Sequence, residues 1–362
     1  MKSNKLGRWL KTVNYPSYFV FFVTAFCNAR CKMCFYQGSM EQNRGAEKEL
    51  SLDEYEKISK SIKLINILGI SGGEPFLRKD LSEIIRILYS RCQPLVVDLP
   101  TNGFYTDDTI KQVEAIARQC PKMIVDVQLS IDGPPEVHNE IRGLTDGFTR
   151  IKETYRQLIP LRKKYPNLRI KACTVYSSFN QNHIEDLLLI YESEFNELDR
   201  VVLSVAHGSV SNPATLDFDW DKYFKLCQRL QNRMTVKSMF DFHSIFTIAL
   251  RILKNVYLKK VLRNKDFYKE CGAGLKVIIV NETGKVFPCE PLWKEVGDLR
   301  SNGYDLGKIL HSSTMRAFQS SMARDACTCH WGLPITNNLL YKPRFYPRLL
   351  AESARIMARS LR

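Results

Sequence analysis

Residues 18–34 read YFVFFVTAFCNARCKMC, an apolar run followed at once by three cysteines. The run from Tyr18 to Phe26 is too short to cross a bilayer. Phe26 is also unsuited to the position before a signal-peptide cleavage site, which takes small side chains. We therefore expect a buried β-strand here, and no signal peptide before it. Cys27, Cys31 and Cys34 then share one loop directly after that strand.

Strand-like and helix-like stretches alternate six times from residue 18 to about residue 206. The strand-like runs are rich in Val, Ile, Leu and Phe, as strands buried on both faces are, and they cover 18–25, 66–70, 95–99, 123–131, 168–176 and 201–206. Helices are expected near 51–64, 79–90, 107–119, 148–164, 181–195 and 219–233. This alternation predicts an α/β fold with right-handed crossovers and a parallel sheet. It leaves open whether the sheet closes into a barrel.

The 362 residues include 11 cysteines and carry a net charge of +15. Many cysteines without a secretory signal are more typical of metal binding than of disulfides. The charge favours anionic partners: a phosphorylated substrate, an acidic membrane surface or nucleic acid, or it simply marks a basic soluble surface. The chain shows no nucleic-acid recognition motif, and its aromatic residues are not interleaved with basic ones, which argues against nucleic acid.

The three cysteines have C-x3-C-x2-C spacing. Three thiolates on one loop can bind three irons of a [4Fe–4S] cluster and leave the fourth iron without a protein ligand. An open metal position is typical of a reactive site. Zinc, which takes four ligands, and chance clustering of core cysteines are the alternatives.

This loop resembles the signature of the radical S-adenosylmethionine (SAM) superfamily, and further motifs at successive strand ends agree with it. They are SGGEP at 71–75, TNG at 101–103, SIDG at 130–133 and Arg142-Gly143. The resemblance implies a partial (β/α)6 radical SAM barrel with Cys27, Cys31 and Cys34 as cluster ligands. It also implies SAM contacts from Met33, Gly72, Gly73, Glu74, Asn102, Ser130, Asp132 and Arg142. Met33 stands where many members have an aromatic residue.

The chemistry implied by the resemblance is reductive cleavage of SAM at the cluster and removal of a hydrogen atom from a substrate. An electron donor such as a flavodoxin or ferredoxin would be its partner. Among substrates we favour a ribosomally made peptide, with dehydrogenation or epimerisation of a sugar or lipid-linked molecule as the alternative. A non-catalytic iron–sulfur or zinc protein for electron transfer or sensing is the remaining alternative. We expect a cytoplasmic oxidoreductase or modifying enzyme.

A second group of cysteines lies near the end of the chain: Cys271, Cys289, Cys327 and Cys329. The run NETG at 281–284 predicts a hairpin turn that brings Cys271 and Cys289 together. The pattern resembles the SPASM/twitch extensions of radical SAM enzymes, in the shorter twitch form with one auxiliary [4Fe–4S] cluster. Zinc is the alternative because four thiolates also satisfy it. His330 could replace one cysteine, although thiolates are the usual ligands.

These features predict five segments: an N-terminal extension at 1–17, the radical SAM core at 18–215, a helical linker at 216–268, a SPASM/twitch-like domain at 269–332 and a basic tail at 333–362. The tail and the basic stretch 251–265 suggest either peripheral binding to an acidic membrane or helices with solvated basic faces. His207, at the end of the sixth strand, is a candidate for proton transfer, and Tyr176 and Glu290 are two further candidates.

Overall fold

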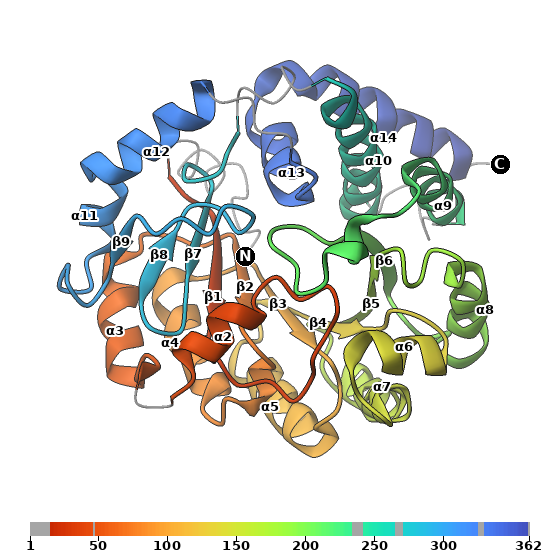
Figure 1. Ribbon diagram of the computed structural model, residues 1–362, viewed down its shortest axis with the longest axis horizontal. Coiled ribbons are helices and arrows are strands. Elements are labelled where there is room, and N and C mark those ends of the chain that lie inside the picture. Colours follow the sequence, from red (N-terminus) through yellow and green to blue (C-terminus); the bar gives the residue numbers. More distant parts are fainter. Residues whose placement is uncertain (1–14, 46–47, 234–241, 265–270, 325–328, 361–362) are drawn as a thin grey trace.

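The computed structural model describes residues 15–45, 48–233, 242–264, 271–324 and 329–360 (Figure 1). Its centre is one sheet of nine strands in the order β6-β5-β4-β3-β2-β1-β7-β8-β9. The first six strands are parallel and match the predicted runs: β1 Tyr18–Phe22, β2 Ile67–Ser71, β3 Val96–Thr101, β4 Ile124–Ser130, β5 Leu168–Tyr176 and β6 Arg200–Val205. The predicted α/β class is confirmed. The sheet curves but ends at β6, so the barrel is partial (Figure 1).

Helices between the strands cover the outer face of this sheet, as right-handed crossovers require (Figure 1). They are α3 Leu52–Ser61, α4 Leu81–Cys92, α5 Thr106–Gln119, α6 Pro135–Arg142, α7 Gly147–Lys164 and α8 Ile184–Glu194. The short helix α2 Gln37–Asn43 lies instead in front of the sheet in this view (Figure 1). The start of α3 illustrates the local control: the Ser51 side chain accepts from the Glu54 amide, while the Glu54 side chain accepts from the Ser51 amide. This reciprocal capping box satisfies two donors that the first turn would otherwise leave unpaired.

The C-terminal part continues the same sheet beyond β1. Strand β7 Val277–Val280 pairs in parallel with β1, then β8 Lys285–Phe287 and β9 Gly297–Asp298 follow as antiparallel neighbours. The predicted turn at 281–284 joins β7 to β8, and Gly284 adopts the left-handed φ of +91° there. β1 is wholly apolar apart from Tyr18, so pairing with β7 protects an edge that would otherwise be open to aggregation.

Two groups of helices complete the molecule. Helices α11 Leu306–Leu310 and α12 Ser313–Arg324 lie beside β7–β9, whereas α9 Trp220–Arg233, α10 Phe242–Arg263, α13 Gly332–Tyr341 and α14 Tyr346–Ser360 lie beyond β6 (Figure 1). Helix α10 packs against both α13 and α14. One face of the basic helix α14 therefore packs against α10, whereas Leu350 on α14 is 70% exposed. Within the ranges that the structure describes, no helix is long and apolar enough to cross a membrane.

Candidate functional site

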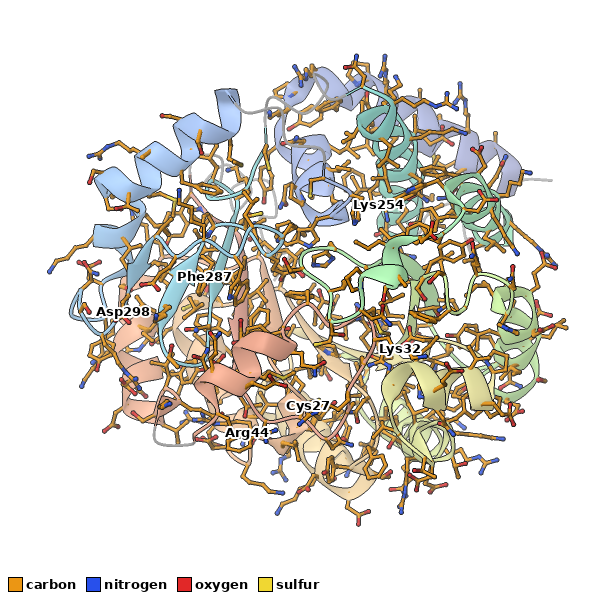
Figure 2. All side chains as sticks on the ribbon, in the orientation of Figure 1. Cys27, Lys32, Arg44, Lys254, Phe287 and Asp298 are labelled. Carbon is orange, nitrogen blue, oxygen red and sulfur yellow. The ribbon has the colours of Figure 1, made fainter. Side chains whose placement is uncertain are left out.

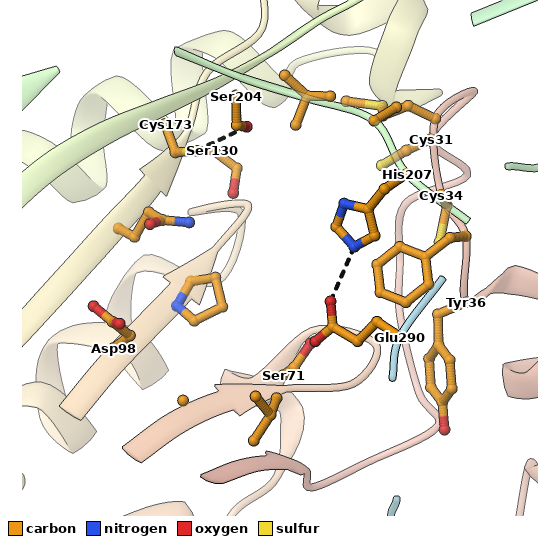
Figure 3. A pocket seen from close by; sticks show the side chains of 18 of the residues that line it. Cys31, Cys34, Tyr36, Ser71, Asp98, Ser130, Cys173, Ser204, His207 and Glu290 are labelled. Carbon is orange, nitrogen blue, oxygen red and sulfur yellow. Dashed lines mark hydrogen bonds and ion pairs between the residues drawn. The ribbon is translucent and has the colours of Figure 1, made fainter. Parts of the chain in front are cut away.

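A cavity of about 580 Å³ opens inside the partial barrel, at the carboxyl ends of the strands (Figure 3). This end is where parallel barrels place their reactive groups. Its wall includes the loop with Cys27, Cys31 and Cys34, the ends of β2 to β6, and residues from α10 and α13. Most of the wall is apolar, so a few polar groups define its chemistry.

The cysteine loop is tied to the rest of the barrel through its backbone. The Arg30 amide donates to the Arg142 carbonyl and the Lys32 amide to the Ile141 carbonyl, both at 2.9 Å. Burial raises the pKa of the Cys27 thiol to about 12 and that of Cys34 to about 11. Both thiols therefore stay protonated until a metal displaces the proton. Three thiols on the wall of one cavity suit an iron–sulfur cluster, in which each thiolate binds its own iron. Among the residues with assigned positions, no three ligand groups surround a single metal-ion position.

The glycines of the SGGEP motif are required by the backbone of this loop. A Cβ on Gly73 would lie 2.0 Å from the Phe26 carbonyl oxygen, and a Cβ on Gly72, whose φ is +127°, would lie 2.5 Å from the Thr24 oxygen. The Gly73 amide donates to Thr24 and the Glu74 amide to Phe26, both at 2.8 Å. The lack of side chains at Gly72 and Gly73 thus allows this loop to approach the backbone of Thr24 and Phe26 closely. This close approach sets where the cysteine loop begins.

Glu74 links three of the motifs from a buried position. Its carboxylate accepts from the Thr101 hydroxyl at 2.9 Å and from the Asn102 amide at 2.7 Å. The Asn102 side chain in turn donates to Asn28 in the cysteine loop at 2.8 Å. Burial raises the pKa of Glu74 to about 7, against the lowering effect of these donors. Glu74 and Asn102 both lie on the cavity wall.

Arg142 is held in place by Asp132. The Arg142 Nε and Nη2 groups donate to one oxygen of Asp132 at 2.7 and 2.6 Å, and the other oxygen accepts from the Val175 amide at 2.8 Å. Arg142 also donates to the Cys31 sulfur at 3.7 Å, and the nearby anions raise its pKa further above its usual range. Arg142 and Ser130 line the cavity, whereas Asp132 is wholly buried behind it. Asp132 was expected to contact SAM, but its position suits it to orient Arg142.

The structure brings two of the three candidates for proton transfer together. His207 follows β6 and Glu290 follows β8, and their side chains meet at 2.9 Å on the cavity wall (Figure 3). The His207 ring also packs 4.9 Å from Phe35, next to Cys34. Tyr176 is not part of this group: it is fully buried outside the cavity wall, and its hydroxyl donates to the Asp219 carbonyl at 3.3 Å. The aromatic packing around Phe218 holds it in the core.

Cys271 and Cys289 of the second cysteine group flank the β7–β8 hairpin. The Gly274 amide donates to the Pro288 carbonyl at 3.1 Å, so the chain after Cys271 adjoins the chain before Cys289. Cys289 and Cys329 are buried. Cys327 lies outside the described residues. His330 is engaged elsewhere, because its Nε2 is 2.6 Å from the Ala206 carbonyl and burial lowers its pKa.

Several residues that line the cavity were not predicted from the sequence. Met33 lines the wall, and so do Asp98, Gln128 and Ser204 from β3, β4 and β6, which the sequence did not predict. Polar side chains within otherwise apolar strand runs were a usable signal for these three. Lys254 from α10 and residues 330–333 and 336 also reach the cavity. No local pattern marks these, because helix packing alone brings them there.

Comparisons with known proteins agree with this geometry. The family model of the radical SAM superfamily matches residues 21–189, and that of the SPASM iron–sulfur cluster-binding domain matches residues 271–330. A relative from Methanosarcina barkeri, named AdoMet-dependent heme synthase, is 26% identical over 80% of this chain and 81% of its own. A probable GTP 3′,8-cyclase from Thermococcus kodakarensis is 30% identical over 46% of this chain and 50% of its own.

Solved structures share the fold at low sequence identity. Streptococcus suis SuiB bound to SAM aligns with a TM-score of 0.58 and 12% identity, over 87% of this chain and 71% of that chain. The structure of anSMEcpe with bound SAM aligns with a TM-score of 0.57 and 15% identity, over 95% of this chain and 99% of that chain. The SPASM match favours an additional iron–sulfur cluster over zinc at the second cysteine group. The chain therefore carries a radical SAM domain and a C-terminal SPASM domain, and these two domains imply SAM, a [4Fe–4S] cluster and a further iron–sulfur cluster as cofactors.

Proposed function

We propose that Cys27, Cys31 and Cys34 hold the [4Fe–4S] cluster and that this enzyme removes a hydrogen atom from a ribosomally made peptide. The observation that carries the proposal is that these three thiols and the His207–Glu290 pair open on one cavity. The cluster with SAM supplies a 5′-deoxyadenosyl radical when both are bound. The protein must then place the substrate carbon beside it and keep water away.

The residues on the wall divide into those that touch SAM and those that position them. Ser130 and Arg142 line the cavity, and a guanidinium suits the SAM carboxylate. The backbone of Gly72 and Gly73 is exposed to the cavity beside the cysteine loop, where it suits the SAM amino group. Met33 and Asn102 complete this part of the wall. We assign Glu74 and Asp132 as positioning residues, because each is buried and saturated by protein donors.

His207 and Glu290 suit the proton transfer that accompanies oxidation of a substrate. Their side chains are only 19% and 11% exposed, so bulk water competes weakly for the proton. The histidine can accept a proton from the substrate while the carboxylate stabilises the resulting imidazolium. Electrons would reach the site from a ferredoxin or flavodoxin. Cys271, Cys289, Cys327 and Cys329 would hold the auxiliary cluster, which would supply an acceptor for the electron released by the substrate.

A peptide substrate is supported by solved structures with this fold, which include SuiB bound to the precursor peptide SuiA and anSMEcpe bound to peptides. A small-molecule substrate is the second candidate. It is favoured by the sequence relatives named AdoMet-dependent heme synthase, which cover most of the chain.

The test begins with anaerobic reconstitution, reduction and an assay for 5′-deoxyadenosine. We expect cleavage of SAM with about 8 irons per chain, since each [4Fe–4S] cluster holds four. Cys31→Ala should abolish cleavage and remove about four irons, whereas Cys173→Ala should change neither. Cys173 is a matched control because it lines the same cavity outside the cysteine loop. Equal iron and cleavage in the two variants would contradict the assignment.

The substrate class can be read from the hydrogen that the radical removes. A perdeuterated cell extract should transfer deuterium to 5′-deoxyadenosine, and protease digestion of the extract should stop the transfer if the substrate is a peptide. Transfer that survives digestion would replace the peptide with a small molecule. A fully loaded, reduced enzyme that forms no 5′-deoxyadenosine even with extract would overturn the proposed reaction.

A further inference from the structure

Lys254 is a cation without a counter-ion on the cavity wall. It lies on α10 (Figure 2), is mostly buried, and makes no hydrogen bond or ion pair with any residue that the structure describes. Burial lowers the pKa of its ammonium group. An ammonium group withdrawn from water is unfavourable unless an anion or several acceptors surround it. A partner from outside the described residues is therefore expected at this position.

The carboxylates of the cavity do not supply that partner. Glu74 accepts from Thr101 and Asn102, and Glu290 pairs with His207. The third, Asp98, accepts from Lys171 at 2.7 Å and from Tyr18 at 3.3 Å. Each carboxylate is thus engaged by other donors, and no carboxylate among the described residues pairs with Lys254.

The start of helix α13 adds a second positive feature beside Lys254. A Cβ built on Gly332 would lie 3.2 Å from Lys254 Cδ and 3.7 Å from its Nζ. Gly332 and Leu333 both line the cavity, and no hydrogen bond engages their amides among the described residues. The N-cap residue Trp331 gives no side-chain cap. The first amides of a ten-residue helix carry partial positive charge and bind anions.

We infer that Lys254 Nζ and the amides of Gly332 and Leu333 form an oxyanion subsite for a carboxylate or phosphate group of the substrate. The inference rests on the proposed function, in which this cavity is the active site. Two positive groups side by side are mutually unfavourable, and a bound oxyanion satisfies both at once. Glycine at 332 leaves room for the Lys254 side chain to lie against the start of α13, since a side chain there would press on the lysine stem. The substrate would therefore be anchored by its charge at the α10–α13 side and present another atom to the SAM side.

Direct binding of small anions tests this subsite without SAM cleavage. Equilibrium dialysis of the cluster-loaded, unreduced protein against radiolabelled phosphate or acetate would count saturable sites. Lys254→Met should weaken one site at least about tenfold, as expected for a hydrogen bond to a charged group, and Lys254→Arg should retain it. Lys122→Met, at an exposed surface lysine, should leave binding unchanged. Iron content and far-UV circular dichroism would show that each variant is folded.

A matched pair of variants at Leu333 tests how much the backbone amides of α13 contribute to anion binding. Leu333→Pro removes one donor in the first helical turn, where proline is tolerated, while Leu333→Ala removes the side chain and keeps the donor. The proline variant should bind the anion roughly fivefold more weakly than the alanine variant. Tighter binding of phosphate than of acetate would assign a phosphate group, and the reverse a carboxylate. Identical binding of both anions by wild type and Lys254→Met would overturn the subsite, whatever the outcome of the 5′-deoxyadenosine assay.

Discussion

Gly73 is the position at which the smallest substitution should disrupt the cysteine loop. In Gly73→Ala the new methyl group would start 2.0 Å from the Phe26 carbonyl oxygen and 3.0 Å from the Cys27 Cβ. Real Cβ contacts are essentially never under 3.0 Å, so the two segments must separate by about 1 Å. The obstacle is backbone on both sides and cannot be relieved by a change of rotamer.

This separation breaks the two hydrogen bonds that join the segments, from Gly73 to Thr24 and from Glu74 to Phe26, each 2.8 Å long. Each is worth about 1 kcal/mol net, and a buried donor left unsatisfied costs more. The total is about 2–4 kcal/mol against the loop position that the cluster needs. We therefore expect Gly73→Ala to lose about four of about 8 irons per chain and to lose SAM cleavage with them.

Gly69→Ala is the matched control because Gly69 lies on β2 and lines the same cavity. A Cβ there would meet only side-chain atoms, with the Tyr18 ring at 3.3 Å as the nearest. That ring can give way, so iron and cleavage should stay near wild type. Iron analysis and 5′-deoxyadenosine formation after anaerobic reconstitution provide the measurement. Full iron and full cleavage in Gly73→Ala would refute the idea that this glycine positions the cysteine loop.

Three further perturbations probe the groups around the cavity. Asp132→Asn should destabilise the apoprotein by about 3–5 kcal/mol in urea unfolding, because it leaves Arg142 as an unpaired buried charge. The control Glu140→Gln removes one partner of an exposed ion pair and should cost under about 1 kcal/mol. Equal losses of stability in the two variants would contradict this role of Asp132. Burial raises the pKa of Glu74 to about 7 from 4.5, so the folded apoprotein holds this proton more tightly than the unfolded chain does. Its stability should therefore fall as the pH rises from about 4.5 to 7, and Glu74→Gln should flatten this part of the thermal-midpoint profile; an unchanged slope would argue against it. His207→Asn should slow substrate turnover roughly 100-fold or more while leaving substrate-independent SAM cleavage intact, and loss of both together would point to a structural role.

Much of the fold was predictable because its signals are local. Apolar runs of strand length, alternating with helical stretches, predict a parallel sheet from neighbouring residues alone, and the capping box at Ser51 is likewise local. The continuation of the sheet through β7 was not predicted, because the pairing of β1 with β7 joins residues more than 250 positions apart in the chain. No periodicity within either segment specifies its neighbour in the sheet.

The candidate site likewise has features that the sequence predicts and features that depend on tertiary packing. By itself the sequence determined the three cysteines on one loop, the glycine motif after β2 and the superfamily to which they point, because spacing along the chain places those ligands. Only the tertiary structure decided that Glu290 pairs with His207 across 83 positions, that Asp132 orients Arg142 behind the wall, and that Tyr176 is a core residue. The same holds for Lys254 beside the start of α13. These contacts depend on how separately formed helices and strands pack, and packing is a property of the assembled core, not of any short segment.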